Sequence, residues 1–256
     1  MKFSVITVTL NSSVVLLGTL SSVADQSLQT IEHIVIDGAS KDNTDELIKL
    51  HGSNFVKYIS ESDLGIYDAM NKGLKLATGE VVCFLNAGDY YVDSGILELV
   101  DRIMTSEGLD IIYGDVAYFR DDNKHKIIRH YRSRFFNPRL LDRGFMPAHP
   151  AFFMRRDAYQ RIEPFRINYK IAGDFEMMIR IFRDNNFRFR YVQEVLVLMR
   201  LGGISNKGLK SLIILNLEIL RACRENGVKT NILKVLTRYP PKIIDFLDNM
   251  FRNKFY

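Results

Sequence analysis

Apolar and polar residues alternate along the first 120 positions in two different rhythms. Short stretches rich in Val, Ile and Thr predict strands at Lys2–Leu10, Ile31–Ile36, Phe55–Ile59, Glu80–Leu85 and, longer and less buried, Asp110–Phe119. Between them apolar residues recur every three or four positions, which predicts helices at Ser12–Ala24, from Ser40 to Leu50, at Ile66–Ala77 and after Asp93. Strands that alternate with helices are typical of βαβ units. We therefore expect an α/β fold with a mostly parallel central sheet flanked by helices.

The second half of the chain is less regular. A stretch dense in Arg, Lys and His could form a flap or an extended hairpin at Arg120–Arg143. Strands are then expected at Ala151–Met154 and Phe187–Leu198, and helices at Arg155–Ile162, Asp174–Arg183, Gly208–Glu225, Thr230–Arg238 and Pro240–Phe251. The pattern predicts one domain over residues 1–205 and a helical C-terminal extension over residues 206–256.

The composition is that of a soluble globular protein, with 47% hydrophobic and 25% charged residues. The net charge of +5 is unevenly spread, because residues 206–256 carry ten Lys and Arg against four Asp and Glu, which leaves the first 205 residues near neutral. Both cysteines lie in apolar patterns, which indicates a reducing compartment and no disulfide framework. We see no signal-peptide or transmembrane pattern and expect a cytoplasmic protein.

Polar residues gather just past the ends of the predicted strands. They are Asn11, Asp37, Glu61, Asp63, Asn86 and Asp89. In open α/β sheets, ligands bind in the crevice beyond the carboxyl ends of the strands. Clustered carboxylates there suit a hard divalent cation, and such a cation suits a phosphorylated substrate. The sequence thus predicts a metal-assisted site for a nucleoside diphosphate.

The loop after the first strand excludes two common nucleotide sites. A Rossmann dinucleotide site needs glycines there, and this turn reads LNSS. The chain also lacks the GxxxxGK[ST] pattern of a P-loop. Thr9 and Asn11 could still hydrogen-bond a nucleotide, although a local turn or helix cap explains them equally well.

The next polar loop, DGASKD from Asp37 to Asp42, is a turn into a helix. Ser40 and Asp42 both fit helix capping. Asp37 precedes the cap and is not needed for it. Its carboxylate could accept a hydrogen bond from a nucleotide base, which would select uracil.

The loop NAGD, from Asn86 to Asp89, is the candidate metal site. Gly88 permits a tight turn, and Asp89 supplies the charge that Mg²⁺ or Mn²⁺ requires, with nucleotide phosphates filling other positions. A lone Asp in such a turn is more often a simple turn residue. The neighbouring polar loops shift the balance toward metal binding.

Two residues of the second half could also take part in chemistry. Asp174 opens a predicted helix, where it could be a general base for a hydroxyl nucleophile or a carboxylate favoured by the helix macrodipole. His149 lies between Pro147 and Pro150 and could bind metal or contact substrate, but a structural histidine fits equally well. The residues alone leave these alternatives open.

Five segments follow one another in a characteristic order: SVITVTLN, VIDGASKDNT, SESDLGIYDAMNKGLKLATGEVVCFLNAGD, IAGDFEMMIRIF and LGGISN. Together they resemble the inverting family 2 glycosyltransferases of the GT-A fold, especially bacterial enzymes that build surface polysaccharides of the colanic acid or O-antigen type. The second segment looks like the family's aspartate-rich turn and the third like the stretch that ends in its DxD motif. The fourth resembles the segment holding the catalytic base. The resemblance covers residues 1 to about 205.

The resemblance implies a role for each matching residue. The nucleotide-sugar would be bound by Thr9, Asn11, Asp37, Ser40, Asp63, Asn86 and Gly88. Asp89 would bind the metal on the diphosphate, and Asp174 would deprotonate the acceptor hydroxyl. The acceptor or a lid would involve His149, Gly203 and Ser205. One departure matters, because Asn86 and Gly88 occupy the first two acidic positions of the DxD-like motif and leave Asp89 as its one carboxylate.

By the same resemblance, the enzyme would move a hexosyl or N-acetylhexosaminyl group from a nucleotide-sugar, with a UDP-sugar as first choice. The acceptor would be a glycan or a lipid-linked glycan in surface polysaccharide biosynthesis. Mn²⁺ or Mg²⁺ and backbone N–H groups would stabilise the departing diphosphate. Attack from the opposite face of the sugar would then invert the anomeric centre.

The basic C-terminal extension has two interpretations. Its first helix carries a wide apolar face and could pack on the catalytic domain or at a homodimer interface. Its later part combines Lys and Arg with Phe246, Phe251 and Phe255 and could lie on anionic lipid. The protein would then be peripheral on the inner face of the cytoplasmic membrane.

Two other classes of function compete with glycosyl transfer. A metal-dependent nucleotidyltransferase would be expected to carry a basic, Gly-rich phosphate loop after the first strand, which is absent here. A noncatalytic membrane-surface or nucleic-acid binding protein would suit the sequence pI of about 9.1. The near-neutral first 205 residues argue against nucleic acid as a partner.

Overall fold

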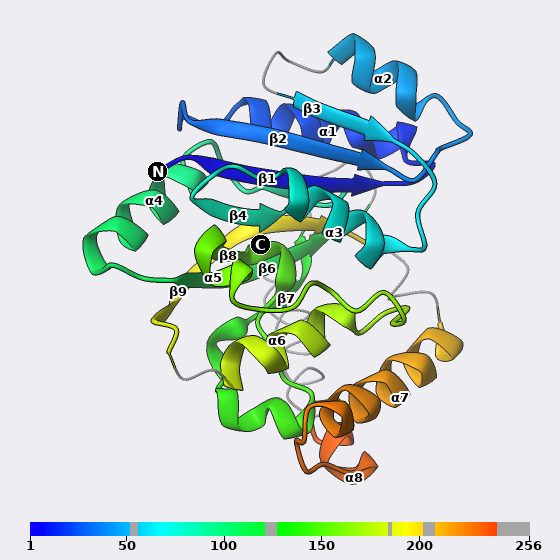
Figure 1. Ribbon diagram of the computed structural model, residues 1–256, viewed down its shortest axis with the longest axis vertical. Helices are drawn as coiled ribbons and strands as arrows, with labels where there is room; N and C mark the ends of the chain where they lie inside the picture. The colour runs from blue at the N-terminus through cyan, green and yellow to red at the C-terminus, as the bar shows by residue number, and fades with distance from the viewer. Residues whose placement is uncertain (52–55, 121–126, 184–185, 202–207, 240–256) are drawn as a thin grey trace, which may run out of the picture.

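The structure is a computed structural model that describes residues 1–51, 56–120, 127–183, 186–201 and 208–239 (Figure 1). Within these residues one sheet runs in the strand order β3-β2-β1-β4-β8-β6-β9-β5, with β7 paired to β6. The strands are β1 (Phe3–Thr9), β2 (Ile31–Asp37), β3 (Val56–Ser60), β4 (Val81–Phe84), β5 (Asp89–Tyr91), β6 (Ile111–Phe119), β7 (Ile127–Tyr131), β8 (Phe152–Arg155) and β9 (Phe189–Arg200).

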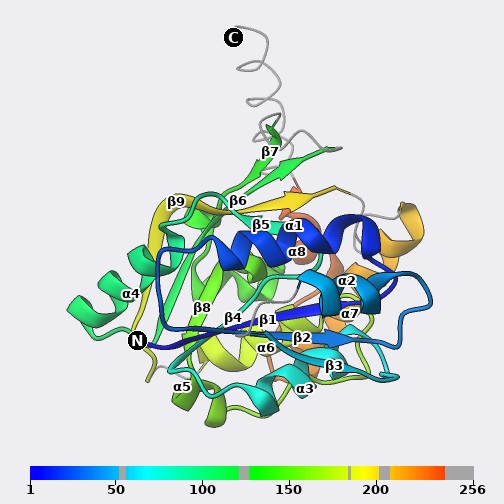
Figure 2. The ribbon, with the colours of Figure 1, turned by 90° about the horizontal axis from the view of Figure 1, so that it is seen from above.

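Helices cover both faces of this sheet. They are α1 (Ser13–Ala24), α2 (Thr44–His51), α3 (Ile66–Leu76), α4 (Ile96–Glu107), α5 (Arg156–Gln160), α6 (Gly173–Arg183), α7 (Leu209–Glu225) and α8 (Ile232–Leu236). Three 3₁₀ turns are η1 (Ser133–Phe135), η2 (Pro138–Arg143) and η3 (His149–Ala151). Figure 2 shows α1 on one face of the strands and α3, α5 and α6 on the other. The α/β architecture predicted from the sequence is confirmed.

The four strands of the first half form the parallel part of the sheet. β1 pairs in parallel with β2 and β4, and β2 pairs in parallel with β3. The last residues of three strands are direct neighbours, because Thr9 faces Asp37 and Asp37 faces Ser60. The loops that follow them therefore start at one level of one edge, as the sequence predicts.

The rest of the sheet is mixed. β8 is antiparallel to β4 and β6, β5 is antiparallel to β9, β7 is antiparallel to β6, and β6 is parallel to β9. Of the flap and the extended hairpin expected for the Arg-rich stretch, the antiparallel β6–β7 pair supports the hairpin at the start of the stretch. The expectation that Asp110–Phe119 is less buried was wrong, since β6 is buried at all positions but Tyr118. It pairs on both sides and packs against both apolar cores.

Side chains of β1 alternate between two apolar cores, as a strand covered on both faces requires. Ile6 and Val8 share a core with α3 and α6, which includes Met70. Phe3 and Val5 belong to a second core that includes Leu97 of α4. Because both faces are buried, the strand is fixed in register.

Helices α7 and α8 belong to the first of these cores. Ile219, Ala222 and Cys223 of α7 and Val235 of α8 are buried in it together with Phe175 of α6. The packing interpretation therefore holds for the start of the C-terminal extension, whereas Pro240–Phe251 lies outside the described residues. No helix in the described ranges is long and apolar enough to cross a membrane.

Candidate functional site

The loops after β1 and β2 are tied together by short polar contacts. The Asn11 N–H donates to Oγ of Ser40 at 2.7 Å, and the Lys41 N–H donates to Oδ1 of Asn11 at 2.8 Å. Asn11 has a φ of 48°, in the left-handed region that Asn tolerates better than most residues. The Oδ1 of Asn11 is therefore used to build the turn. Thr9 is buried beneath it, and its Oγ1 has no hydrogen-bond partner in the described part of the chain.

Asp37 lies fully buried at the end of β2 and organises this edge. Its Oδ2 accepts from the Ser40 N–H at 3.0 Å and from the Ser60 hydroxyl at 2.6 Å. The Ser40 hydroxyl donates to Oδ1. Asp37 thus joins the turn after β2 to the end of β3, and Ser40 extends this contact to Asn11 after β1. The sequence did not reveal this structural task. A nucleotide base would have to approach a carboxylate that already has three donors.

Asp63 lies directly against the turn after β2. A Cβ atom built on Gly38 would come within 2.5 Å of Oδ2 of Asp63, so only glycine fits there without a shift. The other carboxylate oxygen accepts from the Gly65 N–H at 2.8 Å. Glu61 instead pairs with Lys72 at 2.8 Å. The predicted neighbourhood of the second and third loops is confirmed by this contact.

The loop from Asn86 to Asp89 is built as a tight turn. Gly88 has a φ of 92°, and its N–H donates to Oγ1 of Thr19 at 2.9 Å. The Thr19 hydroxyl donates in turn to the Asp89 carbonyl at 3.0 Å. Asp89 is the first residue of β5, a three-residue strand that the sequence did not predict. Burial raises the pKa of its carboxyl well above the usual range.

Two residues of this loop carry oxygen atoms of the kind that a divalent cation binds. Oδ1 of Asn86 is buried and has no hydrogen-bond partner among the described residues, and Asp89, three positions later in the sequence, is buried as well. No three His, Cys, Asp or Glu side chains of the described part are placed to hold a metal together. The expected joint cluster of Glu61, Asp63 and Asp89 is thus not formed, because Glu61 and Asp63 are engaged by Lys72 and Gly65.

Asp174 stands at the start of α6 in a partly buried position. Its Oδ1 accepts from the Phe175 N–H at 2.7 Å and lies 3.5 Å from the Tyr67 hydroxyl. Burial raises the pKa of Asp174 to about 6; hydrogen bonds oppose the shift and the charge of Glu218 adds to it. A carboxylate poised near neutral pH is suited to accept a proton from a hydroxyl group.

The pKa of Tyr118 in β6 responds to both candidate carboxylates. Its pKa is raised by burial, lowered by Arg129, and raised by the charges of both Asp89 and Asp174. The Arg129 guanidinium lies 4.5 Å from the centre of its ring. The charges of Asp89 and Asp174, 85 positions apart in the sequence, therefore both act on one tyrosine. Nothing in the sequence pattern singled out Tyr118.

His149 lies inside the protein. Its ring stacks on Phe84 with centroids 5.1 Å apart and meets the edge of Phe165 at 5.8 Å. Burial lowers its pKa to about 4, so the ring is neutral at physiological pH. Its Nε2 has no hydrogen-bond partner among the described residues. The packing favours the structural-histidine alternative, while Gly203 and Ser205 lie outside the described residues.

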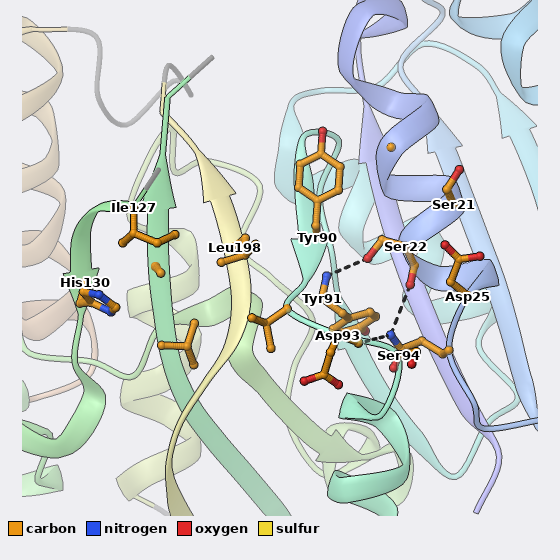
Figure 3. Close-up of a pocket in the computed structure, with 15 residues that line it drawn as sticks. Ser21, Ser22, Asp25, Tyr90, Tyr91, Asp93, Ser94, Ile127, His130 and Leu198 are labelled. Carbon is orange, nitrogen blue, oxygen red and sulfur yellow. Dashed lines mark hydrogen bonds between the residues drawn. The ribbon is translucent and has the colours of Figure 1, made fainter. Parts of the chain in front are cut away.

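A cavity of about 650 Å³ lies elsewhere on the sheet. Figure 3 shows it between Ser21 and Ser22 of α1 with Asp25 just after this helix, Tyr90 and Tyr91 of β5, and Leu198 of β9. Ile127 and His130 of β7 complete its far side. None of the residues predicted for the donor site lines this cavity. We therefore do not assign it as the donor pocket, despite its size.

Comparison with known proteins places this arrangement in a family. The sequence model of Glycosyl transferase family 2 matches residues 4–163. The chain belongs to this glycosyltransferase family. It is 31% identical over 251 residues to a PGL/p-HBAD biosynthesis glycosyltransferase of Mycobacterium tuberculosis, covering 94% of this chain and 92% of that one.

Solved structures of glycosyltransferases share the fold of this family 2 enzyme. S. aureus TarS 1-349 in complex with UDP-GlcNAc superposes with a TM-score of 0.68 at 19% identity, over 87% of this chain and 66% of that one. The mannosyltransferase PcManGT of Pyrobaculum calidifontis, in complex with GDP-Man and Mn²⁺, gives a TM-score of 0.62 at 17% identity, over 86% and 64%. In the structure of a longer TarS chain, the match covers 43% of the length of that chain.

Sequence reasoning missed the side chains that surround the predicted base of this glycosyltransferase. Tyr67 of α3 approaches Asp174, and Glu218 of α7 accepts from the backbone just before it. Tyr67 was visible only as one apolar position of an amphipathic helix, and Glu218 as a charge on another. Neither position carries a sequence signal that separates it from ordinary helix residues.

Proposed function

We propose that this glycosyltransferase transfers a sugar, with inversion at the anomeric carbon, from a nucleoside-diphosphate sugar to a hydroxyl of a glycan or lipid-linked glycan. A UDP-sugar is the first choice of donor. The observation that carries the proposal is Asp174, a carboxyl group at the start of α6 whose pKa of about 6 suits a general base and whose Oδ1 accepts from the Phe175 N–H at 2.7 Å. A base that is ionised near neutral pH is what a single-displacement transfer requires on the acceptor side.

Asp174 acts on the acceptor in this proposal. Above pH 6 its carboxylate is ionised and can accept the proton of the attacking hydroxyl while the new glycosidic bond forms. The bond to the diphosphate breaks at the same time and the electron pair leaves with the phosphate oxygen. The Phe175 N–H donates to Oδ1 and holds the carboxylate in place for this step.

The donor would occupy the edge formed by the loops after β1, β2, β3 and β4. Asn86 and Asp89 would hold the divalent cation, Mn²⁺ or Mg²⁺, which neutralises charge on the diphosphate when bound. Structural relatives support this class of donor, since TarS was solved in complex with UDP-GlcNAc and PcManGT in complex with GDP-Man and Mn²⁺. These two donors carry an N-acetylhexosaminyl group and a hexosyl group, which are the two classes of sugar that we propose.

We extend the proposal to location and assembly. Residues 1–205 would form the catalytic domain, with α7 and α8 packed on its acceptor side. Residues after Tyr239 would contact the inner face of the cytoplasmic membrane, where lipid-linked acceptors of surface polysaccharides are found. The exposed Leu209, Ile213 and Leu217 on α7 support a homodimer or membrane contact for that helix.

A thermal-shift experiment tests the donor class. UDP, GDP, CDP and dTDP are each added with and without Mn²⁺, because a ligand that binds only the folded state raises the unfolding midpoint. We expect the largest rise with UDP and Mn²⁺ together. A larger rise with another nucleotide would keep the enzyme class and contradict the uracil assignment at Asp37.

Turnover then tests the reaction itself. UDP-sugars that shift the midpoint are incubated with candidate acceptors, and the anomeric configuration of the product is read by NMR. Inversion is expected; retention of configuration would contradict a single displacement with Asp174 as base. No shift with any nucleotide and metal would overturn the donor site.

A further inference from the structure

The backbone just before Asp174 is held by a helix far along the chain. One carboxylate, that of Glu218 on α7, accepts hydrogen bonds from the N–H groups of Lys170 at 2.7 Å, Ile171 at 2.8 Å and Ala172 at 2.8 Å. Glu218 is buried, with 9% of its surface exposed. Three consecutive N–H groups that converge on one anion form a rigid nest. Glu218 also lies outside residues 4–163, the part that the family model matches.

Helix α3 contacts the carbonyl side of the same backbone segment. The Tyr67 hydroxyl donates to the carbonyl oxygen of Ile171 at 2.6 Å. Gly173 lies flat against the ring, since a Cβ atom built there would come within 2.7 Å of it. The turn that ends in Asp174 is thus fixed on its N–H side by α7 and on its carbonyl side by α3. Figure 1 shows α7 beside α6, where this contact is made.

We propose that Glu218 is a positioning residue for glycosyl transfer, whose carboxylate fixes the backbone turn that presents Asp174 to the acceptor hydroxyl. This inference rests on the proposed role of Asp174 as base. It gives the C-terminal extension a part in catalysis, because α7 becomes a support for the acceptor side of the site. A shift of about 1 Å in a reacting group can cost on the order of 100-fold in rate.

Glu218 also acts on Asp174 through its charge, in addition to its hydrogen bonds to the backbone. Its negative charge raises the pKa of Asp174, after the larger effect of burial. Tyr67 of α3, whose hydroxyl lies 3.5 Å from Oδ1 of Asp174, has a raised pKa and is neutral near pH 7. The charge of Asp174 also acts on Tyr118 and Tyr131, on which Arg129 acts with the opposite sign, as Arg238 does on Tyr131. Removal of the Glu218 charge should therefore lower the pKa of Asp174.

Simple anchoring of the segment is the competing explanation, and the chain offers a matched control for it. Glu225, two turns further along α7, accepts from Arg166 at 3.0 Å and from the Tyr169 hydroxyl at 2.7 Å. It therefore ties α7 to the same segment without touching the three N–H groups before Asp174. If anchoring were all that mattered, substitutions of Glu218 and Glu225 would act alike on Asp174.

The test compares Glu218→Gln, Glu218→Asp and Glu225→Gln in the full-length protein. The carboxyl of Asp174 is titrated by ¹³C NMR of Asp-labelled protein with chelator present, and its signal is assigned by its loss in Asp174→Asn. Glu218→Gln should shift the titration of Asp174 to lower pH. Glu218→Asp should keep the effect of the charge, but its shorter side chain should lose the hydrogen bonds to the backbone N–H groups. Glu225→Gln should leave the titration unchanged. In turnover, both Glu218 variants should lose kcat by roughly tenfold to 100-fold with little change in the donor KM.

The outcomes separate this inference from the proposed function. An unchanged Asp174 titration and unchanged kcat in folded Glu218→Gln would overturn the positioning role. Equal losses in the Glu218 and Glu225 variants would overturn it in favour of plain anchoring. Full turnover in Asp174→Asn would instead overturn the assignment of the base, and with it the link from Glu218 to catalysis. Folding of each variant is checked by its unfolding midpoint before kinetics.

Discussion

The phenolic oxygen of Tyr67 lies 3.5 Å from Oδ1 of Asp174, although 107 positions separate the two residues. The same oxygen donates to the carbonyl of Ile171 at 2.6 Å, which fixes its position. Helix α3 thereby contacts the turn that leads into α6 and the proposed base at its start.

Tyr67→Phe should change the pH dependence of turnover. The hydroxyl lowers the pKa of Asp174, so its loss should raise that pKa and move the acidic limb of the kcat profile to higher pH. Loss of the bond to Ile171 should also cost about 1 kcal/mol of stability. A pH–rate series and a urea melt measure both effects. Tyr159→Phe, a buried tyrosine packed on Phe84, is the control and should leave the acidic limb in place.

Asp174→Asn should lose activity and gain stability. Loss of a general base typically costs on the order of 10²- to 10⁴-fold in rate. The folded-state pKa of about 6 exceeds the unfolded value, so ionisation of Asp174 lowers the stability of the wild type as the pH rises from about 4 to about 6. At pH 7 the variant should therefore be more stable by on the order of 1 kcal/mol.

Melts of this variant and the wild type at pH 4 and pH 7 provide the measurement. The stability difference should be small at pH 4, where Asp174 is protonated, and larger at pH 7. An equal difference at both pH values would contradict the raised pKa. Donor affinity, measured by thermal shift, should be retained.

Asp89→Asn should remove the metal-dependent part of donor binding. Without the carboxylate, Asn86 is the one remaining protein ligand that we assign, so Mn²⁺ should no longer increase the midpoint shift caused by UDP. The donor KM should rise on the order of tenfold. Asp93→Asn is the control, because Asp93 is exposed and its Oδ1 accepts only from the turn N–H of Gly95 among the contacts the structure describes. Full metal dependence in Asp89→Asn would refute the assignment.

Removal of residues 240–256 should weaken membrane binding and leave the fold intact. The truncated chain keeps α7, whose Ile219 and Ala222 are buried in the main core. Flotation with vesicles that contain anionic lipid should show less of the truncated protein at the top of the gradient. A second truncation after Ser205 would expose this core, so it should lower the unfolding midpoint strongly. Equal flotation of full-length protein and the 1–239 form would contradict a membrane role for the tail.

Much of the donor edge could be predicted from the chain because it is made of local signals. Strands such as Phe3–Thr9 are marked by Val, Ile and Thr, and parallel strands place the loops after them at one edge. Asp37 was found as a polar residue at such an end. The hydrogen bonds that Ser40 and Ser60 donate to it were not predicted, since they depend on side-chain directions in the folded state.

Two kinds of feature escaped prediction. β5 is three residues long, too short for a period of two to stand out, and it exists because Asp89–Tyr91 pairs with β9. The burial of His149 against Phe84 and Phe165 depends on three segments that are distant in the sequence. Its position between two prolines predicted a constrained turn but not which side of it would be buried.

The sequence by itself determined most of the order of strands and helices, the family, and the candidate residues Asp89 and Asp174, because these follow from periodicity and short motifs. Only the tertiary structure decided how the base is supported, with Tyr67 on one side and Glu218 on the other. Long-range contacts of this kind leave no periodic trace, since any polar residue on a helix face fits the local pattern. Their identity is settled by which helix faces pack together once the apolar cores are closed.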